Sequence, residues 1–262
     1  MSDDTENEPM PLPRRLLLFA VLTVACEKRL EEPSPTAAPQ RDLEPSAAPI
    51  VVEVYTDLVC PWCFIGTERL DRAIAASGLG ARVVVRHRAF LLQPDTPDEG
   101  TDIRAYLQAK TGREPTEMFR RVEAVAQESG IPLDLSQQPR IYPTIRAHAL
   151  LRRAVERGTD RALERALFRT YFLDGSDLTN LSTLVTLATQ HGFSEAEARR
   201  IINDPAELTA VREEARQASA RGISGVPYFI FPGGRTLSGA QSEQTLLAAL
   251  TASAPSPAPA TR

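Results

Sequence analysis

The alternation of hydrophobic and polar positions divides the chain into a β–α–β segment, a long helical segment and a β–β–α segment. Residues 50–56 are short, apolar and mostly β-branched, which is typical of a buried strand. A helix is predicted at 61–77, because a proline suits its first position and Gly78 ends it. Residues 82–88 repeat the strand pattern. Strand, helix and strand in this order predict a parallel pair joined by a right-handed crossover.

The segment from residue 101 to about residue 220 has the hydrophobic pattern of helices. The predicted starts are Thr101, Pro115, Pro143, Thr159, Ser194 and Asp204, and the predicted stops are Gly112, Gly130, Gly158 and Gly175. Strands at 226–231 and 235–238 follow as a hairpin, and a last helix is predicted at 241–252. The sequence therefore predicts an α/β fold in which a helical segment separates a βαβ half from a ββα half.

The N-terminal residues 1–26 have the pattern of a secretory signal peptide. Two arginines precede an apolar run at 16–25, which is shorter than the roughly 20 residues that span a bilayer. The run ends at Ala25-Cys26, which resembles a bacterial lipobox with Cys26 as the lipidated residue. An ordinary signal peptide cleaved nearby is the alternative. We therefore expect an exported protein that touches a membrane only through this candidate anchor.

Composition narrows the classes of function. The net charge of −4 argues against a general nucleic-acid partner. Three cysteines are too few for a disulfide framework. The three histidines, His87, His148 and His191, have no partners at metal-ligand spacing, so no metal site is expected.

The run Cys60-Pro61-Trp62-Cys63 stands at the predicted start of the first helix. Disulfide exchange needs an attacking thiolate and a second thiol that resolves the mixed disulfide. The N–H groups and dipole of a helix N-terminus favour the thiolate of Cys60, and Cys63 lies on the same face one turn later. Pro61 stiffens the turn, and Trp62 is expected beside the sulfurs. A structural disulfide or half of a zinc site would be the alternatives, but the sequence holds no second C-x-x-C.

Pro227 is the second candidate feature, because a proline at the entrance of an apolar strand cannot donate a ladder hydrogen bond. We predict a cis Val226–Pro227 bond that faces the cysteine pair and exposes the main chain of Val226 to an extended substrate. The alternative is an ordinary trans proline at the start of a strand.

Several runs together resemble the DsbA family, specifically its FrnE-like branch. They are DLVCPWCFIG at 57–66, AHAL at 147–150, GVPYF at 225–229 and SGAQ at 238–241. The resemblance covers residues 50–252 and implies a thioredoxin fold, a nucleophilic Cys60, a resolving Cys63 and a cis Pro227. The branch often has an Asn-containing turn where this chain has Tyr142-Pro143-Thr144.

This resemblance completes the predicted organisation. The segments are a signal peptide at 1–26, a disordered tether at 27–49, a thioredoxin-like domain at 50–95 and 221–252, an inserted all-helical domain at 96–220 and a disordered tail at 253–262.

Three weaker candidates follow. Glu53 lies in the first strand, where a DsbA-like protein carries a buried acid that exchanges protons with the resolving cysteine; an exposed strand residue is the alternative. His148 matches the branch, but a packed histidine explains it more simply. The arginines at 161, 165 and 169 could bind an anion, although the interleaved Asp160 and Glu164 favour a solvated face.

These features predict an exported thiol–disulfide oxidoreductase that acts on protein substrates and an unidentified redox partner, without a cofactor. The rival hypothesis is a small-molecule isomerase or glutathione-dependent transferase, since the branch also resembles 2-hydroxychromene-2-carboxylate isomerases. Those isomerases usually carry Ser at the position of Cys60, so the cysteine pair favours redox chemistry. A third hypothesis is a chaperone that uses the helical segment as a peptide groove.

Overall fold

The computed structural model describes residues 48–254. The predicted signal peptide, Cys26, nearly all of the tether and the tail from residue 255 onward lie outside the described residues. Among the residues described, no helix has the length and hydrophobicity needed to cross a membrane.

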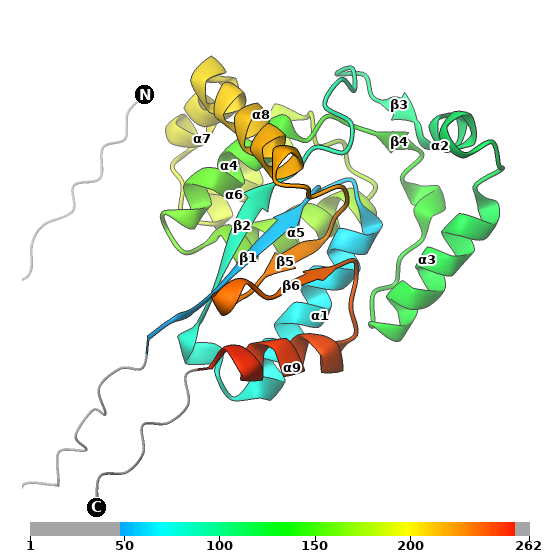
Figure 1. Ribbon diagram of the computed structural model, residues 1–262. Helices are drawn as coiled ribbons and strands as arrows, with labels where there is room; N and C mark the ends of the chain where they lie inside the picture. The colour runs from blue at the N-terminus through cyan, green and yellow to red at the C-terminus, as the bar shows by residue number, and fades with distance from the viewer. Residues whose placement is uncertain (1–47, 255–262) are drawn as a thin grey trace, which may run out of the picture. The chain divides into compact units, whose positions relative to one another are not determined.

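A mixed sheet of four strands in the described part of the chain has the order β2-β1-β5-β6 (Figure 1). The strands are β1 (Ile50–Thr56), β2 (Val83–Ala89), β5 (Tyr228–Ile230) and β6 (Thr236–Ser238). β1 pairs parallel to β2 and antiparallel to β5, which in turn pairs antiparallel to β6. The helix α1 (Pro61–Ser77) makes the crossover between β1 and β2. The predicted α/β class and βαβ unit are confirmed.

The two faces of the sheet are covered by different helices. Alternate residues of β1, Val52 and Val54 among them, pack against Leu70 of α1 and Leu246 of α9 (Glu243–Ser253). Tyr55 points the other way and packs with Ala218 of α8 (Pro205–Ala220). This period of two is the expected behaviour of a strand buried on both faces.

The helices between β2 and β5 begin and end close to the predicted residues. They are α2 (Ile103–Thr111), α3 (Thr116–Glu128), α4 (Ile145–Val155), α5 (Asp160–Phe172), α6 (Leu181–Gln190), α7 (Glu195–Asn203) and α8. Two short strands, β3 (Thr101–Asp102) and β4 (Arg140–Ile141), pair beside them. The cap of α2 is Asp102 rather than Thr101, because the Asp102 carboxylate accepts the Ala105 N–H at 2.7 Å. Sequence reasoning missed α6, whose N-terminus is capped by Asn180.

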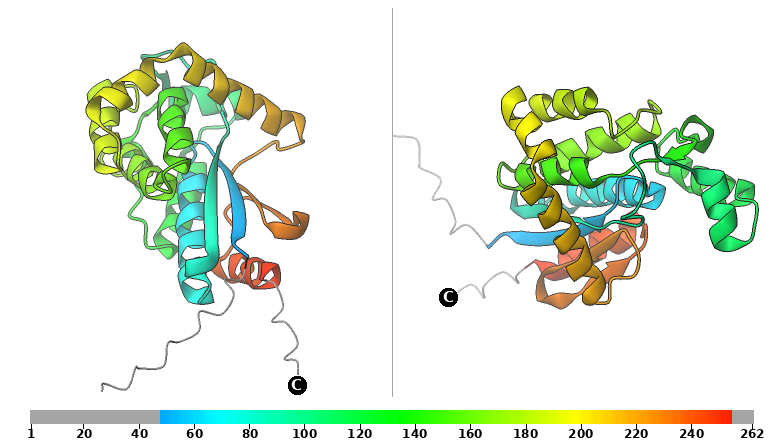
Figure 2. Two further views of the ribbon diagram at one scale, coloured as in Figure 1. Left: turned by 90° about the vertical axis from the view of Figure 1, so that its left-hand side faces the viewer. Right: turned by 90° about the horizontal axis from the view of Figure 1, so that it is seen from above.

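The helical segment shares its core with the sheet and α1. The ring of Phe64 in α1 stacks on Phe168 and Phe172 of α5, with centroids 5.4 and 6.0 Å apart. By contrast, α2 and α3 extend to one side of α1, and α6 and α7 to the other, as two views show (Figures 1 and 2). The packing of α5 against α1 is what brings residues of the helical segment close to the two cysteines.

Candidate functional site

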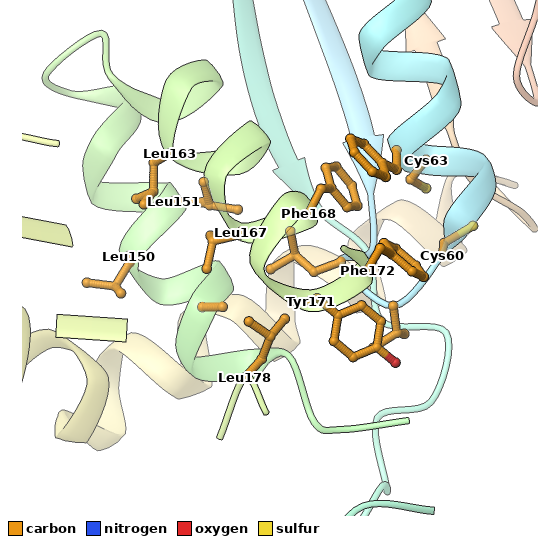
Figure 3. Close-up of a cluster of buried hydrophobic side chains, with 14 of the residues drawn as sticks. Cys60, Cys63, Leu150, Leu151, Leu163, Leu167, Phe168, Tyr171, Phe172 and Leu178 are labelled. Carbon is orange, nitrogen blue, oxygen red and sulfur yellow. The ribbon is translucent and has the colours of Figure 1, made fainter. Parts of the chain in front are cut away.

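Cys60 and Cys63 occupy the first turn of α1, where the sequence placed them. Cys60 is the N-cap residue, and its carbonyl accepts the Cys63 N–H at 3.0 Å. Both thiols are free; Cys60 is 6% exposed and Cys63 is 0% exposed. Figure 3 shows Cys60 at the end of the helix and Cys63 one turn further in, beside the aromatic side chains of α5 (Figure 3). Cys60 is therefore the thiol that a substrate can approach.

The Cys60 sulfur faces the segment that precedes β5. Its thiol donates to the carbonyl of Val226 at 3.7 Å, across 166 residues of sequence. The Val226–Pro227 bond is cis, which confirms that prediction. The sulfur makes no capping hydrogen bond with the N–H groups of α1 in this arrangement, and stabilisation of the Cys60 thiolate by these groups stays a prediction.

An apolar cavity of about 180 Å³ opens beside Cys60. Its walls come from α1, from the loop after β2 and from α2 and α3; among them are Cys60, Trp62, Leu92, Tyr106, Leu107, Lys110, Met118 and Phe119. Lys110 is the one charged residue among the lining residues. Trp62 is half-buried and forms part of the wall, as the sequence predicts.

Cys63 is held as a neutral thiol by its surroundings. Burial raises the pKa of Cys63 well above its usual value, and the neighbouring Cys60 raises it further. A hydrogen bond with the main chain of Asp57 lowers this pKa, whereas the charge of the Asp57 carboxylate raises it. Cys63 must therefore give up its proton to a base before it can attack a disulfide.

Glu53 is not that base, which corrects one expectation from the sequence. Its side chain is 27% exposed and pairs with Arg88 of β2, whose Nε lies 2.9 Å from Oε1. The flanking Val52 and Val54 point toward α1, so Glu53 points to the opposite face of the sheet from Cys63.

Asp57 is the buried acid beside the cysteines, and sequence reasoning missed it. The residue is 1% exposed, and its main-chain oxygen accepts the Cys60 N–H at 3.0 Å. Its carboxylate accepts from the Leu92 N–H at 2.7 Å and from the Thr144 hydroxyl at 2.8 Å. Thr144 lies in the turn where the FrnE-like branch often has Asn, so the departure there still supplies a hydrogen-bond donor. The position of Asp57, directly after a buried strand and three residues before Cys60, was the signal available in the sequence.

The histidines His87 and His148 are fully buried and lie behind Asp57. Their rings stack with centroids 5.1 Å apart, and Nε2 of His87 lies 3.0 Å from Nδ1 of His148. Asp160 and Glu164 of α5 are buried beside His87 rather than solvated, which corrects the reading of that charge pattern. The described residues contain no group of three His, Cys, Asp or Glu side chains arranged to hold a metal.

The arginines of α5 do not form a free stripe. Arg161 and Arg165 both pair with Asp71 of α1, and Arg165 Nε also lies 2.9 Å from Glu68. These pairs fasten α5 to α1 and leave Arg161 and Arg165 poorly placed to bind an anion.

Comparisons with known proteins identify the family and the fold. The DSBA-like thioredoxin domain family matches residues 51–251. A probable DsbA oxidoreductase from Streptomyces coelicolor is 31% identical; the match covers 81% of this chain and 93% of that one, with a TM-score of 0.71. A comparison with curated proteins gave no match.

Two more distant structures share the fold. A 2-hydroxychromene-2-carboxylate isomerase is 19% identical, with a TM-score of 0.59 and coverage of 77% of this chain and 93% of that one. The cytosolic disulfide reductase DsbM from Pseudomonas aeruginosa is 17% identical, with a TM-score of 0.53 and coverage of 75% and 92%. The thioredoxin-like fold is confirmed, and the chain belongs to the DSBA-like thioredoxin domain family.

Proposed function

We propose that this protein exchanges disulfides with protein substrates, with Cys60 as the attacking thiol and Cys63 as the resolving thiol. One observation carries the proposal: the more exposed sulfur is at the N-cap of α1, faces the Val226 carbonyl and has a fully buried second thiol one turn behind it. This arrangement supplies both groups that disulfide exchange requires.

In the reducing direction, the Cys60 thiolate attacks one sulfur of a substrate disulfide. A bond forms between Cys60 and that sulfur, and the other substrate sulfur leaves as a thiolate. Cys63 then loses its proton and attacks Cys60, which forms the Cys60–Cys63 disulfide and releases the second substrate thiolate. Substrate oxidation is the same sequence in reverse.

The cavity beside Cys60 supports a protein substrate. Pockets that enclose small-molecule ligands usually measure about 300–1,000 Å³. A cavity of about 180 Å³ is smaller than that range and is comparable in size to one bulky apolar side chain. A residue that flanks the substrate cysteine would enter this space while the cysteine itself is joined to Cys60.

The isomerase hypothesis has weaker support. The 2-hydroxychromene-2-carboxylate isomerase shares the fold at 19% identity, and this chain keeps two free thiols at the helix start. Insulin reduction and oxidative refolding assays separate the two functions. We expect turnover with the native chain and none with Cys60→Ser. Isomerisation of the chromene carboxylate without disulfide turnover would favour the rival.

Export is a further part of the proposal and rests on the sequence of residues 1–26. We propose cleavage before Cys26 and lipidation of that residue, which would tether the domain to a membrane surface. Mass spectrometry of the mature N-terminus tests this: a diacylated Cys26 supports the anchor, and an N-terminus beyond Cys26 means simple secretion.

A further inference from the structure

A chain of buried titratable side chains leads away from the cysteine pair. It runs from Asp57 after β1 to His148 of α4, then to His87 of β2 and Glu164 of α5. These residues are 1%, 0%, 3% and 3% exposed, in that order. Burying so many ionisable groups is costly unless they bond to one another, and the exchange between Cys60 and Cys63 does not by itself require the last three of them.

The distances between these side chains are short. His148 Nε2 lies 3.5 Å from Asp57 Oδ1, and His148 Nδ1 lies 3.0 Å from His87 Nε2. His87 Nδ1 lies 3.0 Å from Glu164 Oε1, and Thr56 donates its hydroxyl hydrogen to the same carboxylate. Within residues 48–254, His148 Nε2 makes no hydrogen bond, and the carboxylate of Asp57 lies 3.5 Å away from it.

One arrangement of protons satisfies these contacts. If His87 is a cation, it donates from Nδ1 to Glu164 and from Nε2 to His148 Nδ1. Neutral His148 then carries its hydrogen on Nε2, directed toward Asp57. Burial by itself would lower the pKa of His87, but the Glu164 carboxylate, with Glu214 and Asp160, raises it overall. Burial lowers the pKa of His148, and the charge of His87 adds to this effect, while Asp57 opposes it.

Negative charge predominates around this chain of residues. Glu164 lies against the His87 ring, Asp160 accepts the His87 main-chain N–H, and Asp57 lies beside His148, so three buried carboxylates accompany one charged imidazole. The other titratable groups that act on it are Cys60, Cys63, Tyr142, Tyr171 and Glu214, of which Glu214 is paired with Arg88 and Arg152. The charge of Arg161 also acts on Asp160 and Glu164, but this arginine is paired with Asp71 of α1. An excess of buried carboxylate favours the uptake of a proton.

We propose that Asp57, His148, His87 and Glu164 form a buried proton reservoir for Cys63, in which His148 is the positioning residue that couples Asp57 to His87. The inference rests on the proposed function. When Cys63 resolves a mixed disulfide, its proton passes to the Asp57 carboxylate and its sulfur bonds to Cys60. The bond between Cys60 and the substrate breaks, and the electron pair leaves on the substrate sulfur, which is thereby reduced. In the reverse direction, the reservoir returns the proton to the Cys63 thiolate.

A two-phase reaction tests the reservoir. The reduced protein is mixed with a symmetric nitroaryl disulfide, whose thiolate absorbs visible light. Attack by Cys60 releases the first thiolate, and resolution by Cys63 releases the second. We expect His148→Gln to slow the second phase about 100-fold near neutral pH and to leave the first phase unchanged. The control His191→Gln replaces a histidine that bonds to the Leu187 carbonyl, outside the reservoir, and should change neither phase.

The pH profile of the native protein gives a test that needs no variant. With the reservoir, the rate of the second phase reaches a plateau near neutral pH. Without it, the rate rises about tenfold per pH unit through neutral pH and keeps rising in alkaline solution, because only the ionisation of Cys63 itself limits it and burial raises the pKa of this thiol. Such a rise, or an unchanged second phase in His148→Gln, would overturn the reservoir and leave the proposed function standing. Release of only one thiolate per native chain would instead refute the exchange between Cys60 and Cys63.

Discussion

The main chain of Gly66 lies directly against the ring of Pro227. A Cβ placed on Gly66 would come within 2.8 Å of Pro227 Cγ and 3.3 Å of the Phe229 ring. Both neighbours are buried, so they have little room to move. This close approach fixes the distance between α1, which carries the cysteines, and the segment that carries Val226.

Gly66→Ala should therefore reduce the free energy of unfolding by about 1–3 kcal/mol, because overpacking forces the helix away from Pro227. Gly80→Ala is the matched control, since the nearest atom to its Cβ would be 3.9 Å away. Urea denaturation of both variants measures the difference. Equal stability of the two would show that α1 and the Pro227 segment are not held this closely.

The correction at Glu53 predicts different outcomes for two carboxylate-to-amide changes. Asp57→Asn should slow resolution by Cys63 at neutral pH, because the acid beside the thiol is lost. Glu53→Gln should leave the exchange rate unchanged and cost at most about 1 kcal/mol, since its pair with Arg88 is partly exposed. The rate of the second phase in the reaction with the nitroaryl disulfide is measured for both variants. A slow second phase in Glu53→Gln would mean that Glu53 is the acid that exchanges protons with Cys63.

His87 should make the stability depend on pH. Because its pKa is raised in the folded state, its contribution is fully present below the unfolded value of about 6.5 and is lost as pH rises through the folded value. The difference in free energy of unfolding between the native chain and His87→Gln should thus shrink as pH rises from about 6.5 through the folded pKa of His87. Chemical denaturation across pH measures it, with His191→Gln as the comparison. A difference that grows with pH would mean that His87 is neutral when folded.

The cavity beside Cys60 predicts a preference for substrates with a bulky apolar residue next to the cysteine. Met118 lines it and is 41% exposed, so Met118→Gln should fold. We expect about a tenfold loss in kcat/KM for a peptide with Phe beside its cysteine, and little change for one with Gly. Leu181→Gln, at an exposed position in α6 that does not line the cavity, is the control. Equal losses for both peptides would rule out the cavity as a specificity pocket.

The features that could be predicted from the sequence are those set by residues that are close together in the chain. Cys60 and Cys63 form a short motif at a helix start, Pro227 stands at the entrance of an apolar strand, and β1 and α1 follow directly from their hydrophobic patterns. The chain of Asp57, His148, His87 and Glu164 could not be predicted in this way. It forms only because α4 and α5 pack against β2, which joins residues 61 and 77 positions apart.

The spacing of charged residues along the chain was misleading because it does not show which elements pack against one another. Asp160 and Glu164 look solvated beside their arginines, yet the helix turns these acids toward His87 and the arginines toward α1. Glu53 and Asp57 are four residues apart and would share a face in a continuous strand, but β1 ends at Thr56, and the turn into α1 places Asp57 near the cysteines.

The central claim is that Cys60 attacks and Cys63 resolves, and trapping of mixed disulfides tests it most directly. Each cysteine is changed singly to serine in the full chain, and thiol-blocked samples are compared on non-reducing gels and by mass spectrometry. Cys63→Ser should accumulate mixed disulfides with substrate proteins through Cys60, because nothing remains to resolve them, whereas Cys60→Ser should trap none, since the remaining sulfur is fully buried. Equal trapping by the two variants, or trapping by Cys60→Ser alone, would contradict the account.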